Sequence, residues 1–365
     1  MCASPPCTRT SAKPRISKSF WASSRARKTT ARPVTAEDAR WMDVALRLGR
    51  RALGTTAENP NVGCVIVKDG RLLGVGWTQA GGRPHAETEA LRMAGDRALG
   101  ATAYVTLEPC AHHGKTGPCA EALVRAGIAR VVTALEDPDP RVSGGGHAIL
   151  ERAGIAFETG LMADEARRDM AGFLTRITKK RPQVILKMAL SADHMIAGRV
   201  GQRTAISGPE ARARVHLLRA QCDAILVGMG TVLADDPELT CRLPGLEHRS
   251  PMPFVMSRTG QLPPASHLAR RGADVLRGSV PEALAELGRR GINRLMVEGG
   301  ARVARSFLEA GMVDQFHLIQ SAKMLGSEGV AALASLSLEQ ALQPFRMIEQ
   351  ESLGSDTLSV YERRN

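Results

Sequence analysis

Residues 106–123, TLEPCAHHGKTGPCAEAL, place Cys110 and Cys119 nine positions apart, with His112 and His113 between them. Cysteine sulfur and histidine nitrogen are the usual protein ligands of zinc, and a catalytic zinc commonly has three such ligands and one open position for water. The stretch therefore predicts a zinc site to which the two cysteines supply at most two of the ligands.

The third zinc ligand is predicted upstream, in GGRPHAETEAL, residues 81–91. There His85 is followed two positions later by Glu87, at the start of a predicted helix. A histidine at this place can hold the metal while the carboxylate reaches the water that the metal activates, and so serves as general acid and base. The alternative third ligand is His112 or His113, but adjacent side chains rarely converge on one metal.

The chain around these two stretches alternates between short apolar strands and amphipathic helices. Thr35 is a predicted helix N-cap, and Asp69-Gly70 is a typical hairpin turn between two strands. The alternation predicts a three-layer α/β/α fold. In chain order we expect a helix within 35–53, a hairpin within 62–77, a helix within 86–99, a strand within 101–108, a helix within 117–127 and a strand within 128–135.

A second α/β unit is predicted to begin at Pro182, where a basic stretch gives way to a new apolar strand. Its predicted strands lie within 183–190, 223–228, 294–300 and 313–320, and its predicted helices within 209–221 and 301–311. No internal repeat relates the two halves. We therefore expect a disordered tail at 1–33, one α/β domain at 34–181 and a second at 182–365.

The basic charge is concentrated in the tail. The 365-residue chain has a formal net charge of +12, but residues 1–33 hold eight of its Lys and Arg residues and no acid, which leaves +4 for the rest. Such an excess suits a phosphorylated small molecule. It does not favour nucleic acid as a partner, because aromatic stacking residues are also scarce, at 3%. No apolar run approaches the ~18 residues of a membrane span.

The tail is rich in Ser, Thr, Arg and Pro, a composition typical of disorder. It lacks the apolar segment of a secretory signal. An organellar transit peptide is one interpretation, and a start codon assigned too far upstream is the interpretation we favour. The chain has seven cysteines, an odd number, which favours reduced thiols and a cytoplasmic enzyme.

Several segments together resemble the family of bifunctional riboflavin-biosynthesis deaminase/reductases. In the first half these are TTAENPNVGCVIVKDG (55–70), RPHAETEALRMAG (83–95) and TLEPCAHHGKTGPCAEALVRAGIARVV (106–132). The long Cys–Cys spacing with its His-His insertion is specific to that family among cytidine-deaminase-like proteins. In the second half, residues 206–242 and 294–316 match the family's reductase domain in the same register.

For the first half, the resemblance implies a cytidine-deaminase-like α/β/α domain. Its activity would be the hydrolytic deamination of 2,5-diamino-6-ribosylamino-pyrimidinone 5′-phosphate. The resemblance implies a Zn²⁺ ion held by His85, Cys110 and Cys119, beside a catalytic carboxylate. Asn59 and Asn61 would then bring amide groups to the edge of the substrate ring, and their alternative role is to form the Asn-Pro-Asn turn.

For the second half, the resemblance implies a dihydrofolate-reductase-like α/β domain that reduces the ribosyl group to ribityl with NADPH. Arg219 and Arg242 match positions that bind the substrate phosphate, which guanidinium groups grip bidentately, and Leu239 and Glu298 match further substrate contacts. A Gly-Gly turn before a helix offers N–H groups to cofactor phosphates. The implied cofactor contacts are Ala189, Thr231, Asp235, Gly300, Ala301 and Arg302.

The second half also departs from the family pattern. The departures are His194 in place of Gly, Arg203 and Ala205 in place of Ser and Trp, Ser257-Arg258 in place of Asp-Ser, and Ala322 in place of Pro. They leave a second interpretation, a deaminase whose degenerate reductase domain serves as a scaffold. A nucleic-acid-binding protein with a structural zinc is disfavoured, because structural sites normally have four ligands. The expected partners are the phosphorylated pyrimidine and, in a homo-oligomer, further copies of the chain.

Overall fold

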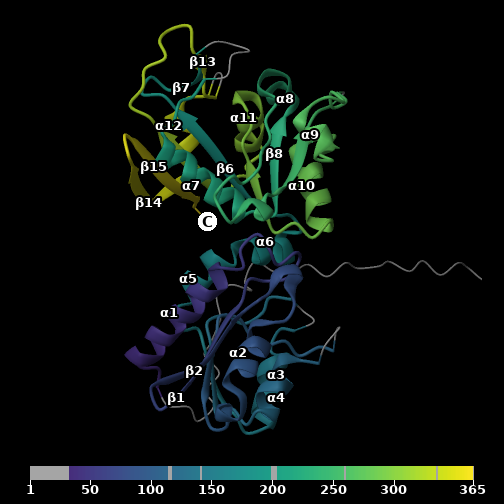
Figure 1. The fold of residues 1–365 in the computed structure, drawn as a ribbon, viewed down its shortest axis with the longest axis vertical. Coiled ribbons are helices and arrows are strands. Elements are labelled where there is room, and N and C mark those ends of the chain that lie inside the picture. Colours follow the sequence, from purple (N-terminus) through teal and green to yellow (C-terminus); the bar gives the residue numbers. More distant parts are fainter. Residues whose placement is uncertain are drawn as a thin grey trace, which may run out of the picture.

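The computed structural model describes residues 33–364, except 114–116, 140–141, 199–203, 259 and 334–335. The expected disordered tail lies outside the described residues up to residue 32. The described chain forms two α/β units, and Figure 1 shows helix α6 (Ala171–Lys179) at their junction.

A five-stranded sheet forms the middle layer of the first unit. Its strand order is β2-β1-β3-β4-β5, with β1 antiparallel to both neighbours and β3, β4 and β5 parallel. The elements are α1 (Ala36–Arg50), β1 (Gly63–Lys68), β2 (Arg71–Trp77), α2 (Ala86–Ala94), β3 (Thr102–Val105), α3 (Cys119–Arg125), β4 (Arg130–Thr133), α4 (Gly145–Arg152), β5 (Ala156–Thr159) and α5 (Ala163–Asp169), with short 3₁₀ turns at Ala80–Gly82 and Gly95–Ala98.

Helices cover both faces of this sheet, so the expected α/β/α layering is confirmed. Helix α1 packs on β1, β2 and β3 and contacts α5, whereas α2 packs on β1 and β2 and contacts α3, which contacts α4 (Figure 1). The enclosed core is built mainly from small and branched aliphatic side chains, with fully buried Met42, Leu46, Ile66 and Leu123 among its largest members.

Helix α1 is fixed to the sheet at its start and along its length. Thr35 caps the helix as predicted, in a reciprocal capping box with Asp38. Asp38 also accepts hydrogen bonds from Tyr104 Oη at 2.7 Å and Arg130 Nη1 at 2.6 Å, which tie the helix to β3 and β4. Further along, the helix backbone approaches β1 so closely that a Cβ on Gly63 would lie 1.8 Å from Ala45 O.

An eight-stranded sheet forms the middle of the second unit, in the order β10-β9-β8-β11-β6-β12-β15-β14. The strands from β10 to β12 are parallel, and β15 and β14 are antiparallel additions at one edge. These strands are β6 (Gln183–Leu190), β8 (Ala224–Gly228), β9 (Met252–Met256), β10 (Asp274–Leu276), β11 (Arg294–Val297), β12 (Gln315–Gln320), β14 (Phe345–Leu353) and β15 (Asp356–Arg363).

The remaining elements of the second unit are helices and one short two-stranded ribbon. They are β7 (Met195–Ala197), α7 (Pro209–Ala220), α8 (Met229–Asp235), a 3₁₀ turn (Glu247–Arg249), α9 (His267–Arg270), α10 (Val280–Arg289), α11 (Ala301–Glu309), β13 (Val330–Ala331) and α12 (Leu338–Leu342). Two groups of buried side chains pack against the sheet, one containing Phe254, Phe307 and Phe316 and the other containing Ile185, Ile225 and Met296.

The expected α/β class is therefore confirmed for both halves, and each predicted helix and strand contains an observed element of the same type. The turn at Asp69-Gly70 has positive φ at both residues, 50° and 71°, as a two-residue hairpin requires. Within the described ranges, no helix combines the length and the apolar character needed to cross a membrane.

The close approach of α1 to β1 generates a stability prediction. Gly63→Ala should lower the free energy of unfolding by about 1–3 kcal/mol, because the new methyl group meets helix backbone that cannot move independently. Gly117→Ala is the matched control, since an added Cβ there has no neighbour within 4 Å. Denaturant unfolding of both variants measures the effect, and equal transition midpoints for the two would contradict this account of the packing.

Candidate active sites

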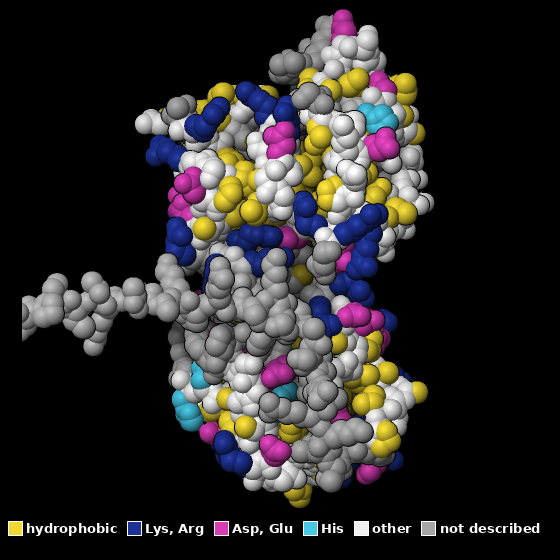
Figure 2. All heavy atoms as spheres, turned by 180° about the vertical axis from the view of Figure 1, so that it is seen from behind, with side chains coloured by type: hydrophobic (Ala, Val, Ile, Leu, Met, Phe, Trp, Pro, Cys, Tyr) yellow, Lys and Arg dark blue, Asp and Glu magenta, His cyan; other side chains and the backbone are white. Residues whose placement is uncertain are grey.

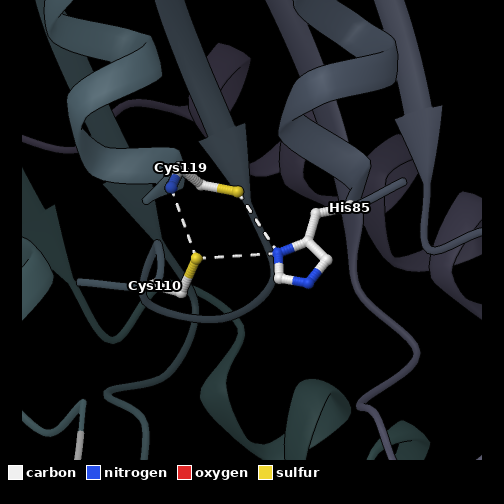
Figure 3. A group of neighbouring side chains, drawn as sticks. All are labelled: His85, Cys110 and Cys119. Atoms are coloured by element: carbon white, nitrogen blue, oxygen red, sulfur yellow. Dashed lines mark hydrogen bonds between the residues drawn. The ribbon is translucent and has the colours of Figure 1, made fainter. Parts of the chain in front are cut away.

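The first candidate site is formed by three side chains from separate segments. His85 is the N-cap of α2, Cys110 follows β3 in the loop after Pro109, and Cys119 is the first residue of α3. Their ligand atoms all lie within 4.8 Å of one another. Figure 3 shows the Nδ1 edge of the imidazole ring directed at both sulfur atoms.

The spacing of these atoms fits a tetrahedral metal. His85 Nδ1 lies 3.3 Å from Cys119 Sγ and 3.6 Å from Cys110 Sγ. Zinc bound tetrahedrally at about 2.0 Å from nitrogen and 2.3 Å from sulfur would separate the two atoms by about 3.5 Å. The donor set, one imidazole and two thiols, is also one that zinc prefers.

The sulfur of Cys110 accepts hydrogen bonds, and these stabilise its thiolate form. The backbone N–H of Cys119 donates to Cys110 Sγ at 3.3 Å. The hydrogen bond from the Cys119 thiol is the largest influence on Cys110 and, with His85 and against the effect of burial, lowers the pKa of Cys110 to about 4. These contacts favour the thiolate form of Cys110, which is the form that binds a metal.

Glu87 lies on the first turn of α2, two residues after His85, and is only 4% exposed. Burial raises the pKa of Glu87 to about 7, and the charge of Cys110 adds to the shift. A carboxyl group with a pKa in this range can both take and return a proton near neutral pH. The sequence prediction placed Glu87 in this role, and the structure places its side chain beside the predicted ligands.

Glu108 is a buried carboxylate that the sequence analysis missed. It lies two residues before Cys110 and accepts backbone hydrogen bonds at 2.9–3.2 Å from four residues around the start of α4, which are Asp137, Gly144, Gly146 and His147. These bonds fix the loop that carries Cys110. The sequence does contain a signal for this residue: the glutamate in TLEPC is a charged residue at the end of the predicted buried strand at 101–108, and a buried charge needs hydrogen-bond partners.

His112 and His113, the alternative third ligands, do not join the cluster. Both are exposed, and His113 Nε2 lies 3.9 Å from Glu121 Oε2, outside the site. Asn61 is 7% exposed, and its Nδ2 lies within 3.4 Å of two backbone carbonyls, those of Gly49 and Asp169. Asn59 Nδ2 donates to Thr56 O at 3.3 Å. The Asn59 amide thus has the local, turn-forming contact considered above, whereas the Asn61 amide lies near backbone carbonyls of α1 and the end of α5.

The second candidate site is a cavity of about 660 Å³ in the second unit, at the ends of β6, β8 and β11. Nine of the ten residues predicted for this half line it. They are Ala189, Arg219, Thr231, Asp235, Arg242, Glu298, Gly300, Ala301 and Arg302. The tenth, Leu239, is 4% exposed and packs in the hydrophobic group around Ile225.

A buried charge cluster lies at the inner end of this cavity. Arg219 binds Glu298 through two parallel hydrogen bonds, of 2.7 and 2.9 Å, and donates a third to Thr240 O at 2.9 Å. Lys187 Nζ lies 3.9 Å from Glu298 Oε2. Burial alone would raise the pKa of Glu298, but Arg219 and Lys187 outweigh it and hold the pKa at about 2. Glu298 is therefore ionised throughout the physiological range.

Lys187 was not predicted, although it lines the cavity beside predicted residues. It is a lysine in the apolar strand QVILKMAL, and an ionisable residue inside a buried strand is the signal that could have identified it. Burial lowers its pKa, and the charge of Glu298 opposes the shift.

Among the described residues that depart from the family pattern, one lines this cavity. Ala205 lines it and offers a backbone carbonyl to Lys323 Nζ at 2.8 Å. His194 is exposed and has φ of 63°, the left-handed conformation that glycine adopts without strain. Ser257 Oγ accepts from Gly260 N at 2.9 Å, and Ala322 is exposed. Arg203 lies outside the described residues.

Comparisons with known proteins assign both sites to recognised families. Residues 35–135 match the cytidine and deoxycytidylate deaminase zinc-binding region, and residues 182–359 match the RibD C-terminal domain. The riboflavin biosynthesis protein RibD of Escherichia coli K12 is 39% identical over 358 residues, covering 88% of this chain and 98% of that protein. Its counterpart from Aquifex aeolicus is 37% identical, with 89% and 98% covered.

Solved structures agree over the same length. Form 1 of Acinetobacter baumannii RibD has a TM-score of 0.84 at 36% identity, covering 90% of this chain and 99% of that one. The diaminohydroxyphosphoribosylaminopyrimidine deaminase/5-amino-6-(5-phosphoribosylamino)uracil reductase of Thermotoga maritima has a TM-score of 0.81 at 34% identity, with the same coverage.

The first site generates a prediction about metal content. Purified protein should contain one zinc per chain, and Cys110→Ala should lose most of it, because two ligands hold zinc far more weakly than three. Cys222→Ala is the matched control, since it also removes a free thiol but one that lies in the second unit, away from the cluster. Elemental analysis after dialysis decides the matter, and full zinc content in Cys110→Ala would remove that residue from the ligand set.

Proposed function

Since the chain belongs to the RibD family of riboflavin-biosynthesis enzymes, which join a zinc-dependent deaminase to a reductase, we propose that residues 34–181 carry its deamination and residues 182–365 its reduction. The observation that carries this division is that each half has its own sheet, its own core and its own site. The substrate is the phosphorylated diaminopyrimidine, deaminated on its ring first and reduced at its ribosyl group afterwards.

In the deaminase site, His85, Cys110 and Cys119 would hold the zinc. When bound, zinc supplies a Lewis acid that lowers the pKa of water toward 7. The carboxylate of Glu87 takes the proton of the attacking water and returns it to the departing amine. The burial of Glu87 serves this role, since a carboxyl group with a pKa of about 7 can both accept and donate a proton near neutral pH. Asn59 and Asn61 orient the ring from the neighbouring loop.

In the reductase site, NADPH supplies the hydride when bound. The Gly299-Gly300 turn and the N-terminus of α11 hold the cofactor phosphates, with further contacts from Ala189, Thr231, Asp235, Ala301 and Arg302. Arg242 binds the substrate phosphate. Its side chain is half-exposed, and its Nη1 donates to Glu238 Oε2 at 2.8 Å and to Thr240 Oγ1 at 3.1 Å. Arg219 and Lys187 hold the Glu298 carboxylate toward the polar part of the substrate. Leu239 packs in the hydrophobic group around Ile225 and is the fourth residue proposed to contact the substrate.

A scaffold role for the second half is the weaker interpretation. A domain kept only as a scaffold has no need to keep a bidentate buried ion pair, an additional buried lysine and a cavity lined by nine of the expected residues. The replacement at Ala205 enlarges the cavity and leaves these polar groups in place.

We also propose a cytoplasmic homo-oligomer. The odd number of cysteines favours reduced thiols and so a reducing compartment. Strand β14 lies at the edge of its sheet and is exposed along most of its length, including Met347 and Ile348. An exposed edge strand with apolar side chains is suited to pairing with a second copy of the chain.

Glu87→Gln should keep its zinc, but its rate of deamination should fall roughly 10²–10⁴-fold. The amide is nearly isosteric with the carboxylate but cannot transfer the proton. Glu89→Gln is the matched control: Glu89 lies two positions further along α2, and its side chain pairs with Arg92 at 2.9 Å. Ammonia release from the diaminopyrimidine phosphate is measured at equal zinc content. Equal rates in the two variants would assign the proton transfer to another group.

Arg242→Ala should raise the reductase KM about ten- to a hundredfold, since a lost hydrogen bond to a charged group costs roughly 1.5–3 kcal/mol. Ammonia release should be unaffected. Arg305→Ala serves as control, because it removes a surface arginine paired with Glu309 outside the cavity lining. NADPH oxidation is followed separately from ammonia release. An unchanged KM in Arg242→Ala would show that another residue binds the substrate phosphate. If the wild-type protein does not oxidise NADPH at all, the scaffold interpretation is favoured.

A further inference from the structure

One loop of the deaminase domain, residues 51–59 between α1 and β1, lies against the reductase domain and is called the interface loop here. Figure 2 shows Lys and Arg side chains gathered where the two halves meet. Arg249 of the reductase domain donates hydrogen bonds to Arg51 O and Leu53 O. At Gly54 an added Cβ would lie 2.7 Å from Ala220 O, so the two backbones are in close contact.

Residues 57–59 of the interface loop are held at their backbone carbonyl groups by the side chains of Asn293 and Arg176. Asn293 Nδ2 donates to Ala57 O at 2.8 Å and to Asn59 O at 3.3 Å. Arg176 Nη2 donates to Glu58 O at 2.5 Å, and Arg176 Nε donates to Asn293 Oδ1 at 2.7 Å. Both polar ends of the Asn293 amide are therefore engaged, and the amide orients Arg176 as well as the loop.

Asn293 itself is rigidly placed. It is 5% exposed and directly precedes β11 of the reductase sheet. Its backbone N–H donates to Asp223 Oδ2 at 3.0 Å, and its carbonyl accepts from Gln183 N at 2.8 Å. By contrast, Ala57 in the loop has φ of 51°, a conformation that costs a residue with a side chain free energy and persists where surrounding contacts hold it.

The interface loop in turn lies on the segment that leads to the zinc ligand. Thr55 O accepts a hydrogen bond from Gly81 N at 2.8 Å. A Cβ on Gly82 would lie 1.9 Å from Asn59 Nδ2, so the Asn59 side chain occupies the space that this glycine leaves open. His85 follows three residues later. The loop therefore connects the reductase domain to both the Asn59 side chain and the turn before His85.

From these contacts we propose that Asn293, a residue of the reductase domain, is a positioning residue for the deaminase reaction. By holding the carbonyls of Ala57 and Asn59, it fixes the end of the interface loop, where Asn59 meets the aminopyrimidine ring and from which the chain continues to Asn61. The proposal rests on the proposed function in assigning substrate contact to these two asparagines. It makes the deaminase site dependent on a side chain of the other catalytic domain, without contact between that side chain and the substrate.

The test compares Asn293→Asp with wild type in the full-length, zinc-loaded enzyme. Aspartate keeps the size of the side chain and the acceptor for Arg176 but loses the donor to the two carbonyls. The KM for deamination should rise about five- to twentyfold, the factor expected for one or two lost hydrogen bonds. The deaminase kcat, the zinc content and the reductase kcat/KM should each stay within about twofold of wild type, because Asn293 contacts none of the reacting groups.

Asn293→Ala should show the same selective rise in KM, and Ser337→Ala is the control for a general loss of stability. Ser337 caps α12 in the reductase domain through a hydrogen bond of 3.1 Å from Gln340 N and has no described contact with the interface loop. The proposal would be overturned if Asn293→Asp had the same deaminase KM as the wild type. It would also be overturned if both activities fell in parallel in the Asn293 variants. The wild-type rate of ammonia release tests the proposed function separately, since the inference concerns only the ratio of variant to wild type.

Discussion

The convergence of three ligand atoms within 4.8 Å is the constraint on which the deaminase half is built. Two of these atoms belong to residues at helix starts, His85 as the N-cap of α2 and Cys119 as the first residue of α3, so the cluster brings the starts of the two helices together. The third ligand, Cys110, comes from a loop, and loops need separate support. Glu108 supplies it by accepting four backbone hydrogen bonds from the region of α4. Burying a carboxylate without hydrogen-bond donors costs a large amount of free energy, and the four backbone N–H groups satisfy the oxygens of Glu108.

The alternation of strands and helices could be predicted from the sequence because it depends on local signals. Thr35 and Asp69-Gly70 mark a helix start and a hairpin by their own chemistry, and both occur as expected. The zinc ligands could also be predicted, since few roles other than metal binding explain a histidine and two cysteines in this context. The same holds for the cavity, where residues far apart in sequence were assigned by resemblance and nine of them line one space.

Features that depend on tertiary contacts were not predictable. Strands β9, β10, β14 and β15 were not identified, and β14 in particular is exposed along most of its length, which removes the alternating apolar pattern of a half-buried strand. Lys187, in the apolar strand β6, and Glu108, in the loop after β3, were missed because a single charged residue among apolar neighbours gives no indication of its partner. The double contact of Arg219 with Glu298 was likewise hidden, since 79 residues separate the two in sequence.

The cavity lining has a kinetic consequence for an enzyme with two reactions. Every described residue that lines it lies between Lys187 and Val330, so the deaminase half contributes no wall to the reductase site. A deaminated intermediate must therefore enter this cavity through an opening that the second half forms by itself. Fusion of the two domains would then act by raising the local concentration of the second site around the first. Such a gain is greatest when the intermediate is dilute and falls away once it accumulates in bulk solution.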